Sequence, residues 1–179
     1  AFIFVSLLVG VQTNKLRIQN QLIRKRAKYN AELHAFSQKL LTAKGKAKIV
    51  HVTTEHIGSL FNVAVLIWER NEEGRLQLLS HKNKLLDPKE ESAAIWCYEN
   101  NHEAGKGSDT IPSARGYYWP LSIGDRAIGT VGIIAKDPER ELDQEEKSEL
   151  LALVTQATLA FERVRSSEKA DIFSSEYDN

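Results

Sequence analysis

A run without glycine or proline, residues 11–44, most constrains how this chain can fold. Apolar side chains recur within it at the steps of a heptad: Leu22, Tyr29, Leu33, Phe36 and Leu40. Such spacing places them on one face of an α-helix, with Arg26 as the polar break. We therefore expect a continuous helix that pairs with a copy of itself. Because the seam is short, packing of this helix on its own domain is the alternative.

An apolar stretch, residues 1–11, precedes this run, and a basic cluster follows it. The basic residues are Lys15, Arg17, Arg24, Lys25, Arg26 and Lys28, before any acidic residue. A membrane span needs about 20 apolar residues, and basic residues after such a span mark its cytoplasmic exit. We interpret 1–11 as the end of a truncated transmembrane helix and 12–44 as a basic juxtamembrane, coiled-coil-like helix. A buried core segment is the alternative, whereas a signal peptide would carry its charge before the apolar run.

Composition narrows the classes of function. Lys+Arg and Asp+Glu both number 24, and this zero net charge argues against a nucleic-acid partner. The single cysteine, Cys97, excludes an intramolecular disulfide and a zinc site built from several cysteines. The histidines show no metal-ligand spacing, so we expect neither a metal nor a cofactor. Because methionine is absent, we expect the chain to be part of a longer protein.

Residues 45–142 have the patterns of a compact core. Helix and strand signals alternate in the order helix 46–61, strand 63–68, strand 75–79, helix 87–101, strand 115–121 and strand 127–135. Two hairpins with flanking helices indicate an α+β fold, an antiparallel sheet covered by helices. Asp87, Pro88 and Glu90 stand at the N-cap, first-turn and capping-box positions of one helix. Pro120 near the end of its strand indicates a sheet edge or a bulge.

A last helix, residues 143–166, begins with a capping-box pattern, Asp143 and Glu146. One apolar face of this helix holds Leu150, Leu153, Val154, Ala157 and Phe161. We expect it to pack on the core and to carry a signal outward. The polar residues 167–179 are expected to form a flexible tail.

The stretch AAIWCYENNHEAGKGSDTIPSARGYYWPL, followed by GDRAIGTVGI, resembles the GAF domain of KdpD-like potassium-responsive sensor histidine kinases. That family carries a loop of the form AG-x-G-[TS]-D-T-[LI]-P, a strand ending in PL and a strand with G-x-[IV]-G. The matching residues are Ala104, Gly105, Gly107, Ser108, Asp109, Thr110, Ile111, Pro112, Pro120, Leu121 and Gly129. Ser108 stands where threonine is commoner. Looser similarity extends from about residue 29 to 165.

The resemblance implies a GAF-like fold within a bacterial two-component sensor of the cytoplasmic (inner) membrane, with this domain facing the cytoplasm. It also implies that the parent protein autophosphorylates a histidine, passes the phosphoryl group to a response regulator and controls potassium uptake. Neither a phosphoacceptor-histidine box nor ATP-binding glycine boxes occur in this chain. We therefore expect no catalytic residue and no enzymatic activity here, and a kinase core elsewhere in the same protein.

Two functions remain open from the sequence. In the first, the chain is a signalling module that dimerises through its helices and relays a change to the kinase core. In the second, it binds a nucleotide or metabolite at the loop of residues 102–113, through Gly105, Gly107, Ser108, Asp109 and Thr110. The loop lacks the spacing of a phosphate-binding P-loop. It also suits a purely structural role, because glycines permit unusual dihedral angles and Pro112 fixes the entry to the next strand.

Overall fold

The computed structural model describes residues 2–71, 73–80 and 87–177, with side chains for residues 20–71, 73–80 and 87–168. The chain divides into two units, Ala1–Gln38 and Lys39–Asn179. Helix α1, Phe2–Thr42, runs without a break, as the absence of glycine and proline predicts. Over the described residues, no helix has the length and apolar character that crossing a bilayer requires. The membrane prediction for 1–11 includes Ala1, which lies outside the described residues.

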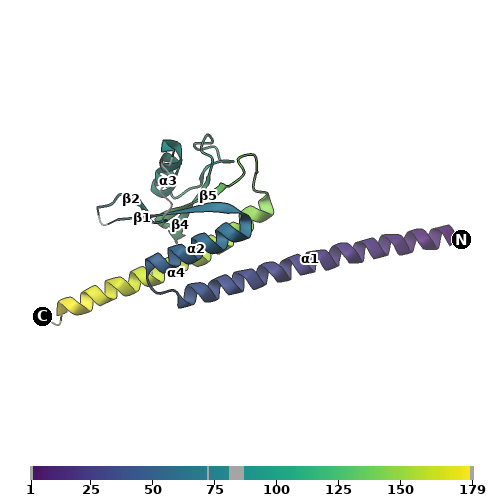
Figure 1. Cartoon of the computed structure of the whole chain (residues 1–179), viewed down its shortest axis with the longest axis horizontal. Coiled ribbons are helices and arrows are strands. Elements are labelled where there is room, and N and C mark those ends of the chain that lie inside the picture. The colour runs from purple at the N-terminus through teal and green to yellow at the C-terminus, as the bar shows by residue number, and fades with distance from the viewer. Residues whose placement is uncertain (1, 72, 81–86, 178–179) are drawn as a thin grey trace. The chain divides into compact units, whose positions relative to one another are not determined.

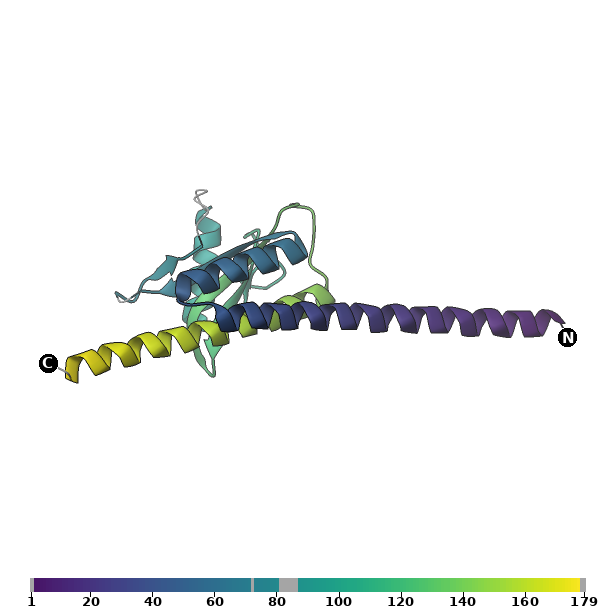
Figure 2. The same ribbon diagram turned by 60° about the horizontal axis from the view of Figure 1, so that its bottom comes forward.

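The second unit contains a five-stranded sheet in which every pair of neighbouring strands is antiparallel. Its strands, in the spatial order β2-β1-β5-β4-β3, are β1 (Val63–Arg70), β2 (Leu76–Leu78), β3 (Ala104–Gly105), β4 (Tyr117–Ile123) and β5 (Arg126–Ala135). Helices α2 (Lys46–Phe61) and α4 (Gln144–Tyr177) lie on one face, and α3 (Pro88–Asn100) lies on the other (Figure 1; Figure 2). The predicted α+β class, an antiparallel sheet covered by helices, is confirmed.

Helix α3 approaches the sheet closely because it buries small side chains. Ala93, Ala94 and Cys97 have no exposed area, whereas Ile95 on the opposite side of α3 is 38% exposed. The hydroxyl of Thr130 in β5 donates to the carbonyl oxygen of Ala94 across this contact. The face of α3 that packs against the sheet is therefore narrow and consists of small side chains.

Aromatic rings fill the layer between α3 and the sheet. Trp68 of β1 and Tyr118 of β4 flank β5, and their ring centroids are 5.8 Å apart. They meet over Gly132, where an added Cβ would come within 2.6 Å of the Tyr118 ring and 3.0 Å of the Trp68 ring. The absence of a side chain at Gly132 thus allows the two rings to pack closely over β5.

Pro120 occupies a position in β4 that the sheet can tolerate. It aligns with Thr130 of β5, and β3 pairs only with Tyr117 and Tyr118. Within the described residues, β4 therefore has a neighbour on one side only from Trp119 onward. A register shift follows between Leu121 and Ser122. The sequence-based expectation of an edge or a bulge is confirmed, and both are present.

Helix α4 begins as its sequence predicts. Asp143 and Glu146 exchange hydrogen bonds, the Glu146 N–H donating to Asp143 over 2.8 Å and the Asp143 N–H donating to Glu146 over 3.1 Å. The helix continues to Tyr177, although the sequence analysis ended it at residue 166 and expected a flexible tail from 167. No glycine or proline stands between residues 144 and 177 to stop it.

Candidate functional site

Several backbone donors of the glycine loop between α3 and β4 are already used in hydrogen bonds within the loop. The N–H of Gly105 donates to the Thr110 carbonyl over 2.8 Å, and the N–H of Lys106 donates to the Gly116 carbonyl over 2.8 Å. The N–H of Ser108 donates back to the Gly105 carbonyl over 3.1 Å. A cradle for an anion built from these N–H groups would first have to break these bonds. The contacts favour the structural interpretation of the loop.

Side chains of the loop reinforce this arrangement. The Ser108 hydroxyl lies 2.9 Å from the carbonyl oxygens of both Gly105 and Thr110, and it accepts from the Thr110 N–H over 3.2 Å. Gly107 and Asp109 are exposed, and Thr110 is half-buried. Ligand binding by Gly105, Gly107, Ser108, Asp109 and Thr110 stays a prediction.

Gly105 is required by the close approach of two backbone segments. Its φ is +90°, in the region that favours glycine, and an added Cβ would lie 2.1 Å from the Gly116 carbonyl oxygen. The same Cβ would lie 2.8 Å from the Tyr118 ring. Both the dihedral angle and the lack of space therefore exclude any larger residue here.

A buried glutamate, which the sequence analysis assigned to a capping box, holds the far end of this loop. Glu90 is 4% exposed, and its carboxylate accepts from the N–H of Arg115 over 2.7 Å and from the N–H of Gly116 over 3.1 Å. It also accepts from the hydroxyl of Tyr118. Asp87 does act as the N-cap of α3, accepting from the Lys89 N–H over 3.0 Å. The capping-box prediction for Glu90 was therefore wrong, because its carboxylate is occupied by more distant donors.

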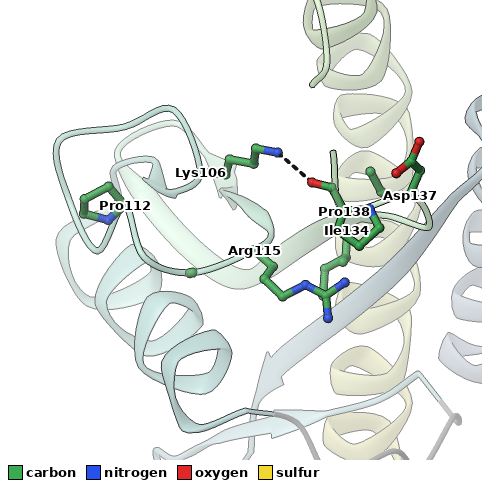
Figure 3. A pocket seen from close by; sticks show the side chains of 8 residues that line it. Lys106, Pro112, Arg115, Ile134, Asp137 and Pro138 are labelled. Atoms are coloured by element: carbon green, nitrogen blue, oxygen red, sulfur yellow. Dashed lines mark hydrogen bonds between the residues drawn. The ribbon is translucent and has the colours of Figure 1, made fainter. Parts of the chain in front are cut away.

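An open pocket of about 210 Å³ lies beside the loop, at the end of β5 (Figure 3). It is lined by Lys106, Pro112, Ala114, Arg115, Ile134, Ala135, Asp137 and Pro138. The sequence analysis placed a candidate pocket at the loop of residues 102–113, and Lys106 and Pro112 come from that loop. None of the five residues predicted to hold a ligand lines it.

Lys106 connects the loop to the segment that leads into α4. Its ammonium group donates to the carbonyl oxygen of Pro138 over 3.3 Å (Figure 3). It also donates to the carbonyl oxygen of Arg140 over 3.2 Å. The guanidinium of Arg140 in turn contacts the Phe61 carbonyl oxygen at the end of α2 and pairs with Glu146. Since Glu146 belongs to the capping box of α4, a series of hydrogen bonds and an ion pair connects the loop with the first turn of that helix.

Tyr117 provides a second contact with the start of α4. Its hydroxyl accepts from the N–H of Leu142 over 3.2 Å, and the Lys147 ammonium lies 5.0 Å from the centre of its ring. Tyr117 also stacks on Trp119 with centroids 6.0 Å apart. Tyr117, in the strand that follows the loop, therefore contacts both a backbone N–H and a side chain near the beginning of α4.

The residues predicted for the signalling face of α4 are part of the core. Those with at most 4% exposure are Leu150, Leu153, Val154, Ala157 and Phe161. The other side of the helix exposes Leu151 by 40% and Leu159 by 54%. With Thr155 between them at four-residue steps, these two leucines form one stripe on the surface of α4, here called the outer stripe.

The predicted seam of α1 has a graded exposure. Leu22 is 48% exposed, Tyr29 and Leu33 are half-buried, and Phe36 is buried. Leu40, in the second unit, is 3% exposed, and its carbonyl oxygen accepts from Arg163 of α4 over 2.8 Å. A role for the seam in dimerisation stays a prediction.

Cys97 lies in an environment that suppresses thiol reactivity. Burial raises the pKa of its thiol from 9.0 to about 12, against a hydrogen bond with Thr130 that lowers the pKa, and the charge of Glu103 raises it further. The nucleophilic thiolate is therefore rare at neutral pH, and the side chain acts as a small apolar residue.

The sequence of the chain is similar to those of two KdpD sensor proteins, although no protein-family model matches it. It is 28% identical to that of Clostridium acetobutylicum over 167 residues, and 26% identical to that of Escherichia coli K12 over 151 residues. These alignments cover 89% and 84% of the chain but 18% and 17% of the relatives. The chain therefore spans less than a fifth of the length of the curated relatives it matches.

The fold is similar to the crystal structure of the GAF domain of the potassium sensor histidine kinase KdpD from E. coli. The TM-score is 0.70 at 23% identity, covering 78% of this chain and 96% of that one. The chain has a GAF-like fold, and its sequence is similar to those of KdpD sensor proteins. The chain also shares its fold with the GAF domain of an Acinetobacter phosphoenolpyruvate-protein phosphotransferase, at a TM-score of 0.63 and 13% identity over 79% of this chain and 98% of that one.

Proposed function

We propose that the chain is the cytoplasmic sensory and signal-transmission module of a membrane-bound sensor histidine kinase that responds to potassium or osmotic stress. In this proposal the module relays a conformational change to a kinase core in the same protein, and a response regulator receives the phosphoryl group from that core. Support comes from the similarity to KdpD sensor proteins over most of the chain. The chain itself contributes no catalytic residue to this function.

One structural observation supports the proposed relay of a conformational change to the kinase core. Helix α4 closes the core with Leu150, Leu153, Val154, Ala157 and Phe161, and then continues as a helix to Tyr177. A helix that is part of the core at one end and extends past it at the other must move when the packing of the core changes. Two alternative packings of the core would thus give two positions of its extension.

We further propose that the module works as a homodimer through its helices, with α1 at the membrane. The buried face of α4 is occupied by the core, so the contact between copies falls on the outer stripe, Leu151 and Leu159. Exposed leucines at helical spacing are suited to such a contact. In α1, the exposed seam residue Leu22 and the half-buried Tyr29 and Leu33 are the candidates for a contact of their own between copies.

The relay is tested in the full-length protein that contains this chain, reconstituted in lipid vesicles and supplied with labelled ATP. Arg140→Gln breaks the ion pair with Glu146 at the start of α4, and we expect it to change the rate of histidine autophosphorylation or its response to potassium. Arg126→Gln, on an exposed residue of β5 away from this contact, is the matched control. Equal phosphorylation in both variants and the parent at every potassium concentration would refute the relay, and absence of phosphorylation in the parent would refute the kinase assignment.

A regulatory ligand is the second candidate function, and the pocket beside the glycine loop favours it. The layer between α3 and the sheet is filled by Trp68 and Tyr118. A small molecule would therefore bind at the margin of the sheet, beside Lys106 and Arg115. This candidate is compatible with the relay, because the same margin contacts the segment that leads into α4.

A further inference from the structure

Two cationic side chains face the pocket at the end of β5 with little to neutralise them. Among the described residues, the Lys106 ammonium donates to two neutral carbonyl oxygens, those of Pro138 and Arg140. The guanidinium of Arg115 has no hydrogen-bond or ion-pair partner among the described residues. Asp137 is the one carboxylate in the lining, and it accepts from the Glu139 N–H over 3.1 Å. The lining therefore has an excess of one positive charge.

The backbone of Arg115 is held in place beside the pocket by a buried carboxylate. Its backbone N–H and that of Gly116 both donate to the buried carboxylate of Glu90. The neighbouring Ala114 is 3% exposed and its N–H donates to the Ile111 carbonyl over 3.0 Å. The backbone that carries the guanidinium is thus fixed, while the guanidinium itself is free to bind.

We propose that this pocket binds a small oxyanion, a carboxylate or phosphate group on a compact solute, between Arg115 and Lys106. The planar fork of a guanidinium matches the paired oxygens of such groups, and an ammonium adds a compact charge. Pro112, Ile134 and Pro138 provide apolar walls for a small body beside the charged group. A pocket of about 210 Å³ is below the range of about 300–1,000 Å³ that holds drug-sized ligands, so the solute has few heavy atoms.

Binding of the oxyanion would change the contacts of the segment that leads into α4. A charged oxygen is a stronger partner for the Lys106 ammonium than a neutral carbonyl. The oxyanion therefore draws Lys106 from the carbonyl oxygens of Pro138 and Arg140, and the 136–143 segment loses one of its ties to the loop. Arg140 joins that segment to Phe61 of α2 and Glu146 of α4. That this change serves as a signal rests on the function proposed above, whereas the binding does not.

The test is a titration of the isotope-labelled chain, followed through its amide NMR signals. The probes are inorganic phosphate and glycerol 3-phosphate, with neutral glycerol as the uncharged counterpart. We expect saturable shifts, with a dissociation constant of about 1 mM, at the amides of residues 106, 115, 137, 139 and 140, and smaller shifts at 143–147. Glycerol should leave these signals unchanged. A stronger response to glycerol 3-phosphate would indicate that the apolar walls contribute, and an equal response would assign binding to the charged group alone.

Substitutions separate a built site from general attraction of anions. Arg115→Gln and Lys106→Gln should each weaken binding about tenfold, while Lys48→Gln, on an exposed residue of α2, should not. Arg115→Gln alters only an exposed side chain, so it remains informative if Lys106→Gln disturbs the loop. Shifts that never saturate, that occur elsewhere in the chain, or that weaken equally in all three variants would overturn the site. Saturable binding with unchanged signals at 143–147 would overturn the coupling to α4.

The two experiments distinguish failure of the proposed function from failure of the proposed binding site. A chain that binds phosphate at Arg115 within a protein that never phosphorylates itself would refute the kinase module and leave the site intact. A working potassium-responsive kinase whose GAF domain shows no shifts with either probe would refute the site alone.

Discussion

The carboxylate of Glu90 in α3 accepts a hydrogen bond from the hydroxyl of Tyr118 in β4, and both groups are buried. Burial, followed by the hydrogen bond to Glu90 and the charge of Glu90, raises the pKa of the Tyr118 hydroxyl above its usual range. The same carboxylate accepts two backbone N–H groups at the end of the glycine loop. One side chain therefore joins the helix, the loop and the sheet on this face of the domain.

Replacing this carboxylate should destabilise the fold strongly for so small a change. Glu90→Gln keeps the shape but substitutes an NH₂ group for one of the acceptor oxygens, which leaves a buried donor facing donors. We expect the free energy of unfolding in urea to fall by about 1–3 kcal/mol. Glu91→Gln, at an exposed position one residue along, should change it by less than about 0.5 kcal/mol. Equal effects of the two substitutions would contradict the role assigned to Glu90.

Gly105 should be the least replaceable residue of the loop. In Gly105→Ala the new methyl group meets the Gly116 carbonyl oxygen and the φ stays at +90°, so strain and overlap together should cost more than about 3 kcal/mol. Gly124→Ala is the matched control, because its φ is +59° but no atom lies within 4 Å of the added Cβ. That variant should lose only about 1 kcal/mol. Similar thermal midpoints for the two variants would show that the contact with Gly116 is dispensable.

Stability should decline in alkali partly because of Cys97. The folded thiol keeps its proton up to about pH 12, whereas the unfolded thiol releases it from about 9.0. Between these values unfolding releases a proton, so the contribution is fully present below pH 9 and is lost as the pH rises. The free energy of unfolding should fall by up to about 1.4 kcal/mol per pH unit from this group.

Cys97→Ala removes that contribution, so its stability profile above pH 9 should be flatter than that of the parent. Some decline remains because the pKa of Tyr118 is also raised. Urea unfolding from pH 7 to about 10.5 gives both profiles, and any cost of the smaller side chain appears equally at every pH. Parallel profiles would mean that the thiol titrates alike in the folded and unfolded chains.

Self-association should depend on the outer stripe of α4. Leu159→Glu places a charge on a residue that is 54% exposed, so the fold should survive while a contact between copies is lost. We expect sedimentation equilibrium to show a dimer dissociation constant raised at least about tenfold. Ile95→Glu, on the exposed side of α3 across the sheet, is the control for an added charge. A dimer unaffected by Leu159→Glu would move the interface away from this stripe.

The starts of the helices follow from residues close together in the sequence, whereas the candidate site depends on contacts between residues far apart in the sequence. The start of α4 follows from Asp143 and Glu146, which are three residues apart, and the N-cap of α3 follows from Asp87. Glu90, in contrast, bonds to groups 25, 26 and 28 residues further along the chain. Its position in the first turn of a helix suggested a local partner, and nothing in the sequence pointed to the distant ones.

The pocket beside the glycine loop is lined by other residues than the five that the sequence suggested for a ligand. The glycines and Ser108 attracted attention because their backbone can bind anions, but folding uses those donors within the loop. Lys106 and Arg115 line the pocket, and their neighbours come from the end of β5 and the segment beyond it. Because that neighbourhood depends on how β5 and β4 align, it could not be derived from spacing along the chain.

Pro120 has a consequence for how copies of this domain can meet. One border of the sheet is the three-residue β2, and the other is the two-residue β3 beside a stretch of β4 that contains a proline and an irregular step. A neighbouring molecule finds only short or interrupted rows of unpaired amide and carbonyl groups on these described borders, which disfavours extension of the sheet across molecules. The short and interrupted borders thereby protect the domain against fibrous aggregation through its sheet edges.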